Sequence, residues 1–484
     1  MTHQIIGREK EIKTLQRLLE SPRPEFLAIY GRRRVGKTYL IHEYYRDKGV
    51  YFCITGRMHS NKKTQIRDFY YELKNRFSLP DSVEEPKDWD EALILLKEAV
   101  EAIDPTKKVI IFFDELPWLA SPRSGFLSAL EHLWNQYLSH LNNVLLIVCG
   151  SAAHWIIKKI VCNKGGLYGR LSEVIKLGAF TLEETEKFLL SHNVKLSRKA
   201  LVELYMTIGG IAKYLTYVHP GESVAQTVNR LCFTPQGQLV SEFQNLYQSL
   251  FDSPQKHIQI VRGLAEKRSG VLQRELLEKL KIPSGGGASL LIEELQEAGF
   301  IGSSPEFHKR TKDKRLWLID EYSYFYLTWI EPIKEGIVLG NDPDYWLKMQ
   351  QSTRWKSWSG YAFESLCLKH VAQIKRALGI AAVLTSESQW AYRPRDPSEK
   401  GAQIDLIIDR GDDCINLCEI KFCHTTFTID AAYARELERK IAVFREQTKT
   451  RKTIFLTMIT PYGVHRNEYA TELVSQELTM EDLF

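Results

Sequence analysis

The chain has 484 residues, of which 44% are hydrophobic and 26% charged, and its 65 lysines and arginines against 60 acids give a formal charge of +5. This length and composition allow about two or three packed cores, so extensive disorder is excluded. The small net charge does not by itself indicate nucleic acid, and no apolar run approaches the roughly 20 residues that span a membrane. We therefore expect a cytoplasmic, multidomain protein that does not enter a membrane.

A glycine-rich loop lies between residues 26–30, which predict a buried strand, and residues 39–45, which predict a helix. The loop comprises Gly31, Arg32, Arg33, Arg34, Val35, Gly36, Lys37 and Thr38. Strand, loop and helix are the context in which G-x-x-x-x-G-K-[ST] binds phosphate. Backbone N–H groups face the phosphates, Lys37 neutralises the β and γ oxygens, and Thr38 can bind Mg²⁺. We predict an ATP site formed by this loop and Tyr39; the alternative is a purely structural turn.

Two acidic residues, Asp114 and Glu115, follow the second buried strand, which is expected at residues 109–113. In a phosphate-binding protein this position suits a Walker B pair, with Asp114 binding Mg²⁺ and Glu115 polarising the attacking water. The alternative is that both acids cap the next helix. A further buried strand, residues 143–149, ends at Ser151, which could sense the γ-phosphate or simply cap a helix.

The middle of the chain is predominantly helical. Residues 181–253 predict a helical lid, and helices expected at 257–267, 272–280 and 288–298 precede a hairpin whose second arm is 315–319. Three helices and a hairpin predict a winged-helix domain at 254–335. Basic residues that could contact phosphate crowd the hairpin: His308, Lys309, Arg310, Lys312, Lys314 and Arg315. The presumed recognition helix carries Glu293, Glu294 and Glu297, so the alternative is a domain that only joins its neighbours.

Residues 336–484 place four charged side chains in a particular order. Glu364 lies in a helix expected at 363–374, and Asp405 lies in a strand expected at 404–408. Glu419 and Lys421 share one face of a strand expected at 415–422, because side chains alternate along a strand. A helix from about 431 and a strand at 453–458 follow. Buried acids beside a lysine are costly unless a cation and a water lie between them.

The N-terminal motifs resemble those of the archaeal-type AAA/STAND-related P-loop ATPase family of prokaryotes. The matching segments are Gly7-Arg8-Glu9 with Glu11, the glycine-rich loop, residues 114–118, Gly150-Ser151 and residues 167–170. The resemblance implies that Arg170 is an arginine finger, which a neighbouring copy in a homo-oligomer could supply, with an exposed surface arginine as the alternative. It also implies that Gly209, Gly210 and Ile211 mark the lid.

The C-terminal order resembles the restriction-endonuclease-like core, PD-(D/E)xK. This resemblance implies that Asp405 and Glu419 bind Mg²⁺, Lys421 orients or activates water, and Glu364 completes the metal shell. The alternatives are an inactive relative kept for binding and a chance arrangement of charged strand residues.

The expected fold is a multidomain α/β protein. It has a parallel-sheet P-loop ATPase core at 1–180, a helical lid at 181–253, a winged-helix domain at 254–335 and a restriction-endonuclease-like domain at 336–484. The expected function is ATP binding and hydrolysis that controls a Mg²⁺-dependent nuclease-like domain acting on nucleic acid, on DNA in preference to RNA. The alternative is a STAND-like, ATP-dependent switch whose C-terminal domain binds nucleic acid or protein without cleavage.

Overall fold

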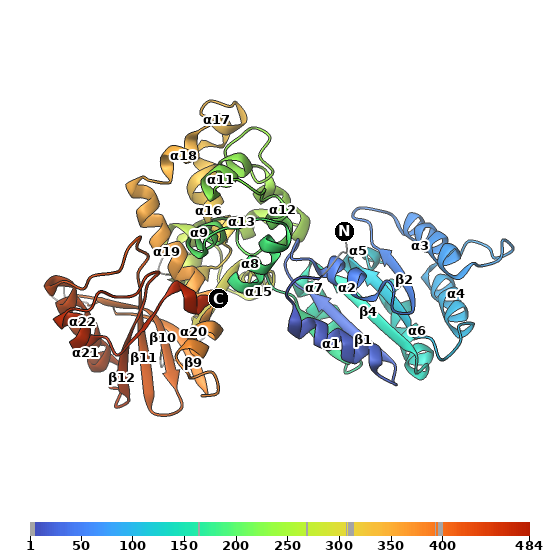
Figure 1. The fold of residues 1–484 in the computed structure, drawn as a ribbon. Helices are drawn as coiled ribbons and strands as arrows, with labels where there is room; N and C mark the ends of the chain where they lie inside the picture. Colours follow the sequence, from blue (N-terminus) through green and yellow to red (C-terminus); the bar gives the residue numbers. More distant parts are fainter. Residues whose placement is uncertain are drawn as a thin grey trace. The chain divides into compact units, whose positions relative to one another are not determined.

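The computed structural model describes residues 5–162, 165–267, 270–305, 307, 314–392, 394 and 400–484. The chain divides into two compact units, Met1–Ala179 and Phe180–Phe484 (Figure 1). Within the described ranges, no helix is both long enough and apolar enough to cross a membrane. The domain boundaries expected at 253/254 and 335/336 fall inside the second unit and stay predictions.

The first unit is built around a five-stranded parallel sheet in the order β2-β3-β4-β1-β5. Its strands are β1 (Glu25–Tyr30), β2 (Val50–Thr55), β3 (Val109–Asp114), β4 (Val144–Gly150) and β5 (Glu173–Lys176). Its α-helices are α1 (Glu9–Glu20), α2 (Lys37–Tyr45), α3 (Lys62–Phe77), α4 (Trp89–Glu101), α5 (Leu116–Leu119), α6 (Phe126–Gln136) and α7 (Ala153–Ile156). The strands expected from the apolar runs are therefore present, with ends within one residue of the prediction.

Strand order decides which loops meet at the carboxyl edge of this sheet. Every residue of β3 and β4 is buried, as expected of continuous apolar runs in a sheet covered on both faces. Side chains of α3, α4 and α6 share one core with alternate residues of these strands. Because β4 lies between β1 and β3, the loop after β4 separates the loops after the other two strands. The residue that follows β4 can therefore contact both neighbouring loops.

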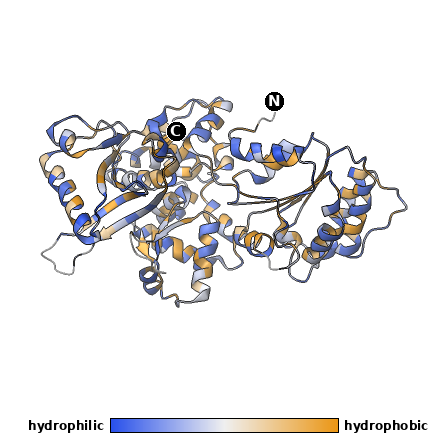
Figure 2. Cartoon of the chain, turned by 90° about the horizontal axis from the view of Figure 1, so that it is seen from below, coloured by the Kyte–Doolittle hydropathy of each residue, from blue (hydrophilic) through white to orange (hydrophobic). Residues whose placement is uncertain are grey.

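The second unit begins with helices and a small antiparallel sheet. The helices of the expected lid are α8 (Leu182–Ser191), α9 (Arg198–Ile208), α10 (Ala212–Leu215), α11 (Val224–Cys232) and α12 (Glu242–Leu250). They are followed by α13 (Pro254–Glu266), β6 (Val271–Leu272), α14 (Gln273–Lys279), α15 (Gly286–Glu297), β7 (Ile301–Pro305) and β8 (Lys314–Leu318). The three strands pair in the order β6-β8-β7. In Figure 2 the helices carry orange and blue residues side by side, as amphipathic helices do.

The basic hairpin differs in part from the expectation. His308, Lys309, Arg310 and Lys312 lie outside the described residues. Arg315 is buried and donates to the Gly270 carbonyl oxygen at 3.2 Å, so it does not belong to a basic surface. Alternation along β8 explains this, because Arg315 and the exposed Lys314 face opposite sides of a strand.

The C-terminal part of the second unit contains a mixed five-stranded sheet. Three short helices, α16 (Glu321–Phe325), α17 (Lys334–Val338) and α18 (Tyr345–Met349), precede α19 (Thr353–Lys369) and α20 (Val371–Ala377). The remaining elements are β9 (Thr385–Tyr392), β10 (Ala402–Arg410), β11 (Cys414–Ile420), α21 (Ala431–Thr448), β12 (Thr453–Ile459), α22 (Glu468–Leu473) and β13 (Gln476–Leu478). The sheet order is β13-β12-β11-β10-β9, antiparallel from β9 to β11 and parallel from β11 to β13.

The single helix expected at 363–374 is wrong, because the structure has two helices. The first helix begins at Thr353 and ends at Lys369, and His370 breaks it with φ −105° and ψ 27°. The buried imidazole of His370 lies 2.8 Å from the Leu366 carbonyl oxygen, and its Nε2 accepts a 3.2 Å hydrogen bond from the Leu182 N–H. The hydrogen bond from Leu182 stabilises this interruption of the helix. Because its two residues are 188 positions apart, periodicity in the sequence cannot reveal it.

His370 should make the stability of the second unit depend on pH. Burial lowers its pKa from 6.5 to about 4. In the unfolded chain the imidazole binds a proton below pH 6.5, whereas in the folded chain it stays neutral down to about 4. The unfolded state then binds more protons, so the free energy of unfolding should fall by up to about 3 kcal/mol as the pH drops through this window. Urea titrations from pH 7.5 to 4.5 would measure the loss, and His370→Gln should remove this component; an unchanged pH dependence would contradict it.

Candidate functional site

The glycine-rich loop has the backbone conformation that its sequence requires. Gly31 and Gly36 have φ values of 146° and 96°, in the region that favours glycine. A Cβ at Gly31 would lie 2.1 Å from the Leu177 carbonyl oxygen, so no side chain fits there. Lys37, the first residue of α2, is buried and donates to the carbonyl oxygens of Gly31 and Arg32, each at 3.0 Å. Its ammonium group is thus held inside the curve of the loop.

The expected acids lie beside this lysine. Thr38 Oγ1 donates to Asp114 Oδ2 at 2.9 Å, so the predicted Mg²⁺ ligands are in contact. Asp114 Oδ1 is buried without an N–H or O–H donor in the described part of the chain. Burial, followed by the charge of Glu115, raises the pKa of Asp114, so a cation there would relieve an unfavourable charge. This chemistry suits a divalent metal.

Ser151 connects the lysine with the second acid. Its Oγ lies 3.1 Å from Lys37 Nζ and 2.7 Å from Glu115 Oε1, and its N–H donates to Glu115 Oε2 at 3.2 Å. Glu115 is held at φ 46°, a left-handed conformation that is uncommon outside glycine. The position of β4 between β1 and β3 makes these contacts possible.

The other expected loop residues differ in exposure. Arg32 and Val35 are buried, whereas Tyr39 is 47% exposed. The Arg33 guanidinium lies 5.6 Å from the ring centroid of Trp118, and Arg34 has φ 72°.

Arg8 supports the loop in a way that sequence motifs did not indicate. It is buried, and its Nη2 donates to the carbonyl oxygens of Val35 at 3.3 Å and Gly178 at 2.8 Å. One guanidinium therefore ties the loop to the end of the first unit. The sequence motif Gly7-Arg8-Glu9 contains this arginine but does not reveal its partner, because a contact between residues 170 positions apart leaves no periodic pattern in the sequence.

Arg170 lies apart from these contacts. Its side chain is exposed in the segment between β4 and β5, and it forms no ion pair with the described residues. The neighbouring Tyr168 is also 68% exposed. This exposure fits either of the roles considered from the sequence.

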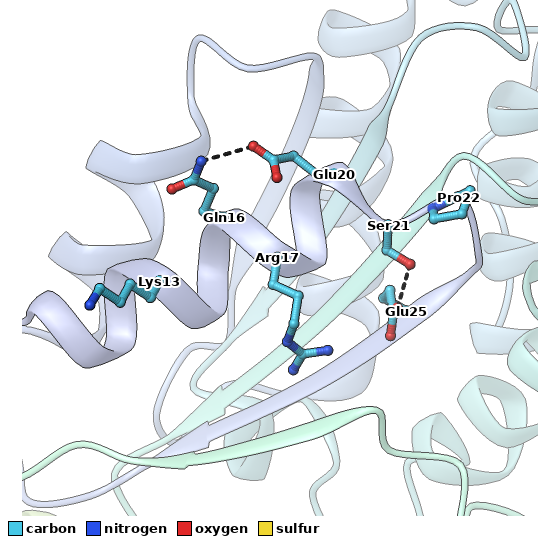
Figure 3. Close-up of a pocket in the computed structure, with 7 residues that line it drawn as sticks. All are labelled: Lys13, Gln16, Arg17, Glu20, Ser21, Pro22 and Glu25. Carbon is cyan, nitrogen blue, oxygen red and sulfur yellow. Dashed lines mark hydrogen bonds between the residues drawn. The ribbon is translucent and has the colours of Figure 1, made fainter.

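A hollow of about 420 Å³ lies at the opposite edge of the same sheet, where α1 ends and β1 begins (Figure 3). Gln16 donates to Glu20 and Ser21 donates to Glu25, so its polar groups partly satisfy one another. The glycine-rich loop follows the carboxyl end of β1, so this hollow does not belong to the candidate phosphate-binding site.

A second charged cluster surrounds Glu419 in the C-terminal sheet. Lys440 Nζ lies 2.8 and 2.9 Å from the two Glu419 oxygens, Lys421 Nζ lies 2.9 Å from Oε1, and the Tyr433 hydroxyl donates to Oε1 at 2.7 Å. Burial alone would raise the pKa of Glu419, but the charges of Lys421 and Lys440 outweigh it and lower the pKa. Lys421 lies one residue beyond β11, not within a strand ending at 422 as expected, yet it still reaches Glu419.

Asp405 and Glu364 belong to the same electrostatic cluster. Asp405 accepts a 3.0 Å hydrogen bond from the Ile420 N–H, and burial, followed by the charge of Glu419, raises its pKa to about 7. Burial, followed by the charge of Asp405, also raises the pKa of Glu364 well above its ordinary value. The four residues selected from the sequence therefore influence one another electrostatically, but no three His, Cys, Asp or Glu side chains among the described residues lie close enough together to hold a metal. Lys440 and Tyr433 are additional members, both supplied by α21.

The comparisons match the first part of the chain to a protein family and longer stretches of it to individual proteins. Residues 5–218 match the family described as "ATPase domain predominantly from Archaea". The chain contains an archaeal-type ATPase domain. The uncharacterized protein MJECL04 of Methanocaldococcus jannaschii is 25% identical over 417 residues, which make up 83% of each chain. The Walker-type ATPase paby2304 of Pyrococcus abyssi is 18% identical, with a TM-score of 0.50, over 68% of this chain and 99% of that one, a similarity of fold alone.

Proposed function

We propose that the archaeal-type ATPase domain hydrolyses ATP with the residues gathered at the carboxyl edge of its sheet. Lys37 would bind the β and γ oxygens of ATP. Thr38 and Asp114 would hold Mg²⁺, for which Asp114 Oδ1 is suited because it accepts no hydrogen bond from the described residues. Glu115 would orient and polarise the attacking water, with Ser151 keeping its carboxylate in place. The contact network from Lys37 through Ser151 to Glu115 supports this assignment.

We further propose that nucleotide state controls a Mg²⁺-dependent nuclease in the C-terminal sheet. The supporting observation is that the buried acids Glu364, Asp405 and Glu419 lie on a helix, a strand and a second strand in this order, and that the partly exposed Lys421 contacts Glu419. Asp405 and Glu364 would hold the cation, because both carboxyls are buried, burial and then the charge of Asp405 raise the pKa of Glu364, and Glu364 Oε1 accepts no hydrogen bond from the described residues. When bound, Mg²⁺ would polarise the scissile phosphate and lower the pKa of its water.

Glu419 and Lys421 would act together in this nuclease. Glu419 would offer a metal-binding oxygen once Lys440 releases one of its two contacts. Lys421 would orient the water or stabilise the negative charge that develops on the phosphate oxygens. Its 2.9 Å contact with Glu419 fixes its ammonium group at the cluster.

DNA is the proposed substrate in preference to RNA. The supporting feature is the order α13, β6, α14, α15, β7 and β8, three helices with a three-stranded antiparallel sheet, which is the order of a winged helix. Incubating the purified protein with linear, circular and single-stranded DNA and with RNA, with Mg²⁺ or Mn²⁺ and with or without ATP, tests the proposal. Absence of cleavage under all these conditions would contradict it.

One observation favours the alternative of an ATP-dependent switch with a non-cleaving C-terminal domain. Both oxygens of Glu419 are bound by Lys440, and one is also bound by Lys421. If these contacts persist with Mg²⁺ present, Glu419 cannot join the metal shell. The domain would then bind nucleic acid or protein without cutting it, and gel-shift binding without cleavage would identify this state.

Arg170 should act in trans if the protein works as a homo-oligomer. The exposed guanidinium could then reach the γ-phosphate bound by a neighbouring copy. The ATPase rate per chain should rise with protein concentration, and mixing Arg170→Ala with Glu115→Gln chains should restore turnover, because each supplies what the other lacks. Steady-state ATPase assays of the mixtures measure this effect. A monomer by light scattering, with a concentration-independent rate and no rescue, would rule it out.

A further inference from the structure

A pocket of about 140 Å³ lies among the helices of the second unit, and none of the residues that line it belongs to the two candidate sites described above. Its lining comes mainly from α9, α11, α18, α19 and the loop that follows β11. α9 contacts α11 and α19, α11 contacts α18, and Figure 1 shows these helices in the same part of the unit. An apolar cavity of about 150 Å³ holds one benzene ring. The pocket therefore has room for a ligand with one six-membered ring.

Two tryptophans form a fixed apolar wall of this pocket. Trp346 and Trp355 are 2% and 5% exposed, and their rings stand nearly perpendicular, at 86°, with centroids 5.2 Å apart. Asn229 of α11 accepts a 3.1 Å hydrogen bond from the backbone N–H of Trp346, and the Trp346 ring stacks on Phe233 with centroids 5.3 Å apart. These contacts hold the wall in place before a ligand binds, which lowers the entropy lost on binding. Such a wall suits a flat ring of low polarity.

Glu203 of α9 supplies a hydrogen-bond acceptor to the pocket. Its carboxylate accepts no hydrogen bond from the described residues, and its ion pair with Lys199 spans 4.0 Å, which is too long for one. Burial raises the pKa of Glu203, because the charge of Lys199 offsets the burial only in part. A ligand that donates N–H groups to this carboxylate would stabilise its charged form. The amides of Gln350 and Gln351 also line the pocket and can contact other polar atoms of a ring.

Positive charge gathers on the solvent side of the pocket. His424, in the loop after β11, lines the pocket and is exposed. Lys199 lies one turn before Glu203 on α9 and pairs with it. Burial, followed by the charges of Lys199 and Lys356, lowers the pKa of His424. A phosphate group here would accept hydrogen bonds from these side chains and reduce their mutual repulsion.

A nucleotide combines the features that this pocket can recognise, because it joins a flat base to a phosphate. Room for one six-membered ring favours a pyrimidine over a purine. The Glu203 carboxylate favours cytosine, whose amino group donates hydrogen bonds where uracil and thymine carry a carbonyl oxygen. We propose that this pocket binds the cytosine base of a nucleotide or of a single nucleic-acid strand. The base lies against the two tryptophans with its amino group at Glu203, and its phosphate lies near Lys199 and His424. The inference goes beyond the proposed functions, since it requires neither ATP hydrolysis nor cleavage.

Titration calorimetry of the full chain with deoxycytidine and deoxyuridine monophosphates (dCMP and dUMP), with EDTA to remove divalent cations, tests this proposal. The chain should bind dCMP on the order of tenfold more tightly than dUMP. Glu203→Gln keeps the shape of the side chain but replaces one acceptor oxygen with a donor, and should remove this preference. His424→Gln should weaken the binding of both nucleotides alike. Glu183→Gln, in an exposed ion pair with Lys187, should bind as the unchanged chain does, and so should Lys37→Ala, which lacks the lysine of the glycine-rich loop.

A preference for dCMP that Glu203→Gln abolishes, with unchanged thermal unfolding of the variant, supports the pocket. Single-stranded decamers of deoxycytidine and deoxyuridine identify the source of the base. If the deoxycytidine decamer binds more tightly than dCMP, with the same dependence on Glu203, the source is a strand; if it binds equally or more weakly, the source is a free nucleotide. Equal affinity of Glu203→Gln and the unchanged chain for dCMP overturns the proposal. Loss of dCMP binding in Lys37→Ala also overturns it, as does an absence of binding to both dCMP and the decamer.

Discussion

Replacing Lys37 with alanine should abolish ATP binding. The ammonium group of Lys37 is buried and is held by two loop carbonyl oxygens and Ser151, so it is already positioned where phosphate oxygens would bind. Removing it leaves the β and γ oxygens without a fixed cation in a poorly solvated site. We expect the affinity for ATP to fall at least about a hundredfold, which corresponds to about 2.7 kcal/mol.

Titration calorimetry with ATP and Mg²⁺ would measure this loss directly. Lys13→Ala is a suitable control, because Lys13 is an exposed lysine of the same unit that lines the hollow at the opposite edge of the sheet (Figure 3). That variant should bind ATP as the unchanged chain does. An unaltered affinity in Lys37→Ala would show that the glycine-rich loop is not the nucleotide site. Glu115→Gln offers a second check, since it should bind ATP and lose only turnover.

Local sequence was sufficient to predict the strands and the loop that carry the proposed nucleotide site. The strands before Gly31 and Asp114 are continuous apolar runs, and a parallel sheet covered on both faces buries such runs completely. The glycine positions follow from local backbone geometry, which the sequence encodes directly. Strand order does not follow from local sequence, and the contact of Ser151 with both Lys37 and Glu115 depends on it.

The C-terminal cluster shows where sequence reasoning was insufficient. Glu364, Asp405, Glu419 and Lys421 could be selected because a charged residue in an apolar run is conspicuous. Lys440 lies in a helix with many charged residues, and the sequence alone does not show which of its lysines faces the sheet. Only the packed structure shows that Lys440 contacts Glu419. Lys440 reaches Glu419 only through the packing of α21 against the sheet.

Replacing Asp405 with asparagine should eliminate Mg²⁺-dependent cleavage of DNA while ATP hydrolysis continues. The amide can still accept the hydrogen bond from the Ile420 N–H, so the backbone contact survives. The substitution removes the negative charge that would hold the cation beside the scissile phosphate. That Lewis-acid contribution is worth several kcal/mol, so we expect the cleavage rate to fall at least about a hundredfold.

Asp409→Asn is the matched control for this change. Asp409 lies on the same strand, but its carboxylate contacts Lys452 at 2.7 Å and is not in contact with the Glu419 cluster. The control should cleave DNA at the unchanged rate, and both variants should retain ATPase activity, because the proposed nucleotide site lies in the first unit. Gel assays on linear, circular and single-stranded DNA, with ATP turnover measured in the same samples, decide the question. Equal cleavage by Asp405→Asn and the unchanged chain would exclude Asp405 from the chemistry and leave the C-terminal cluster as a structural core of a binding domain.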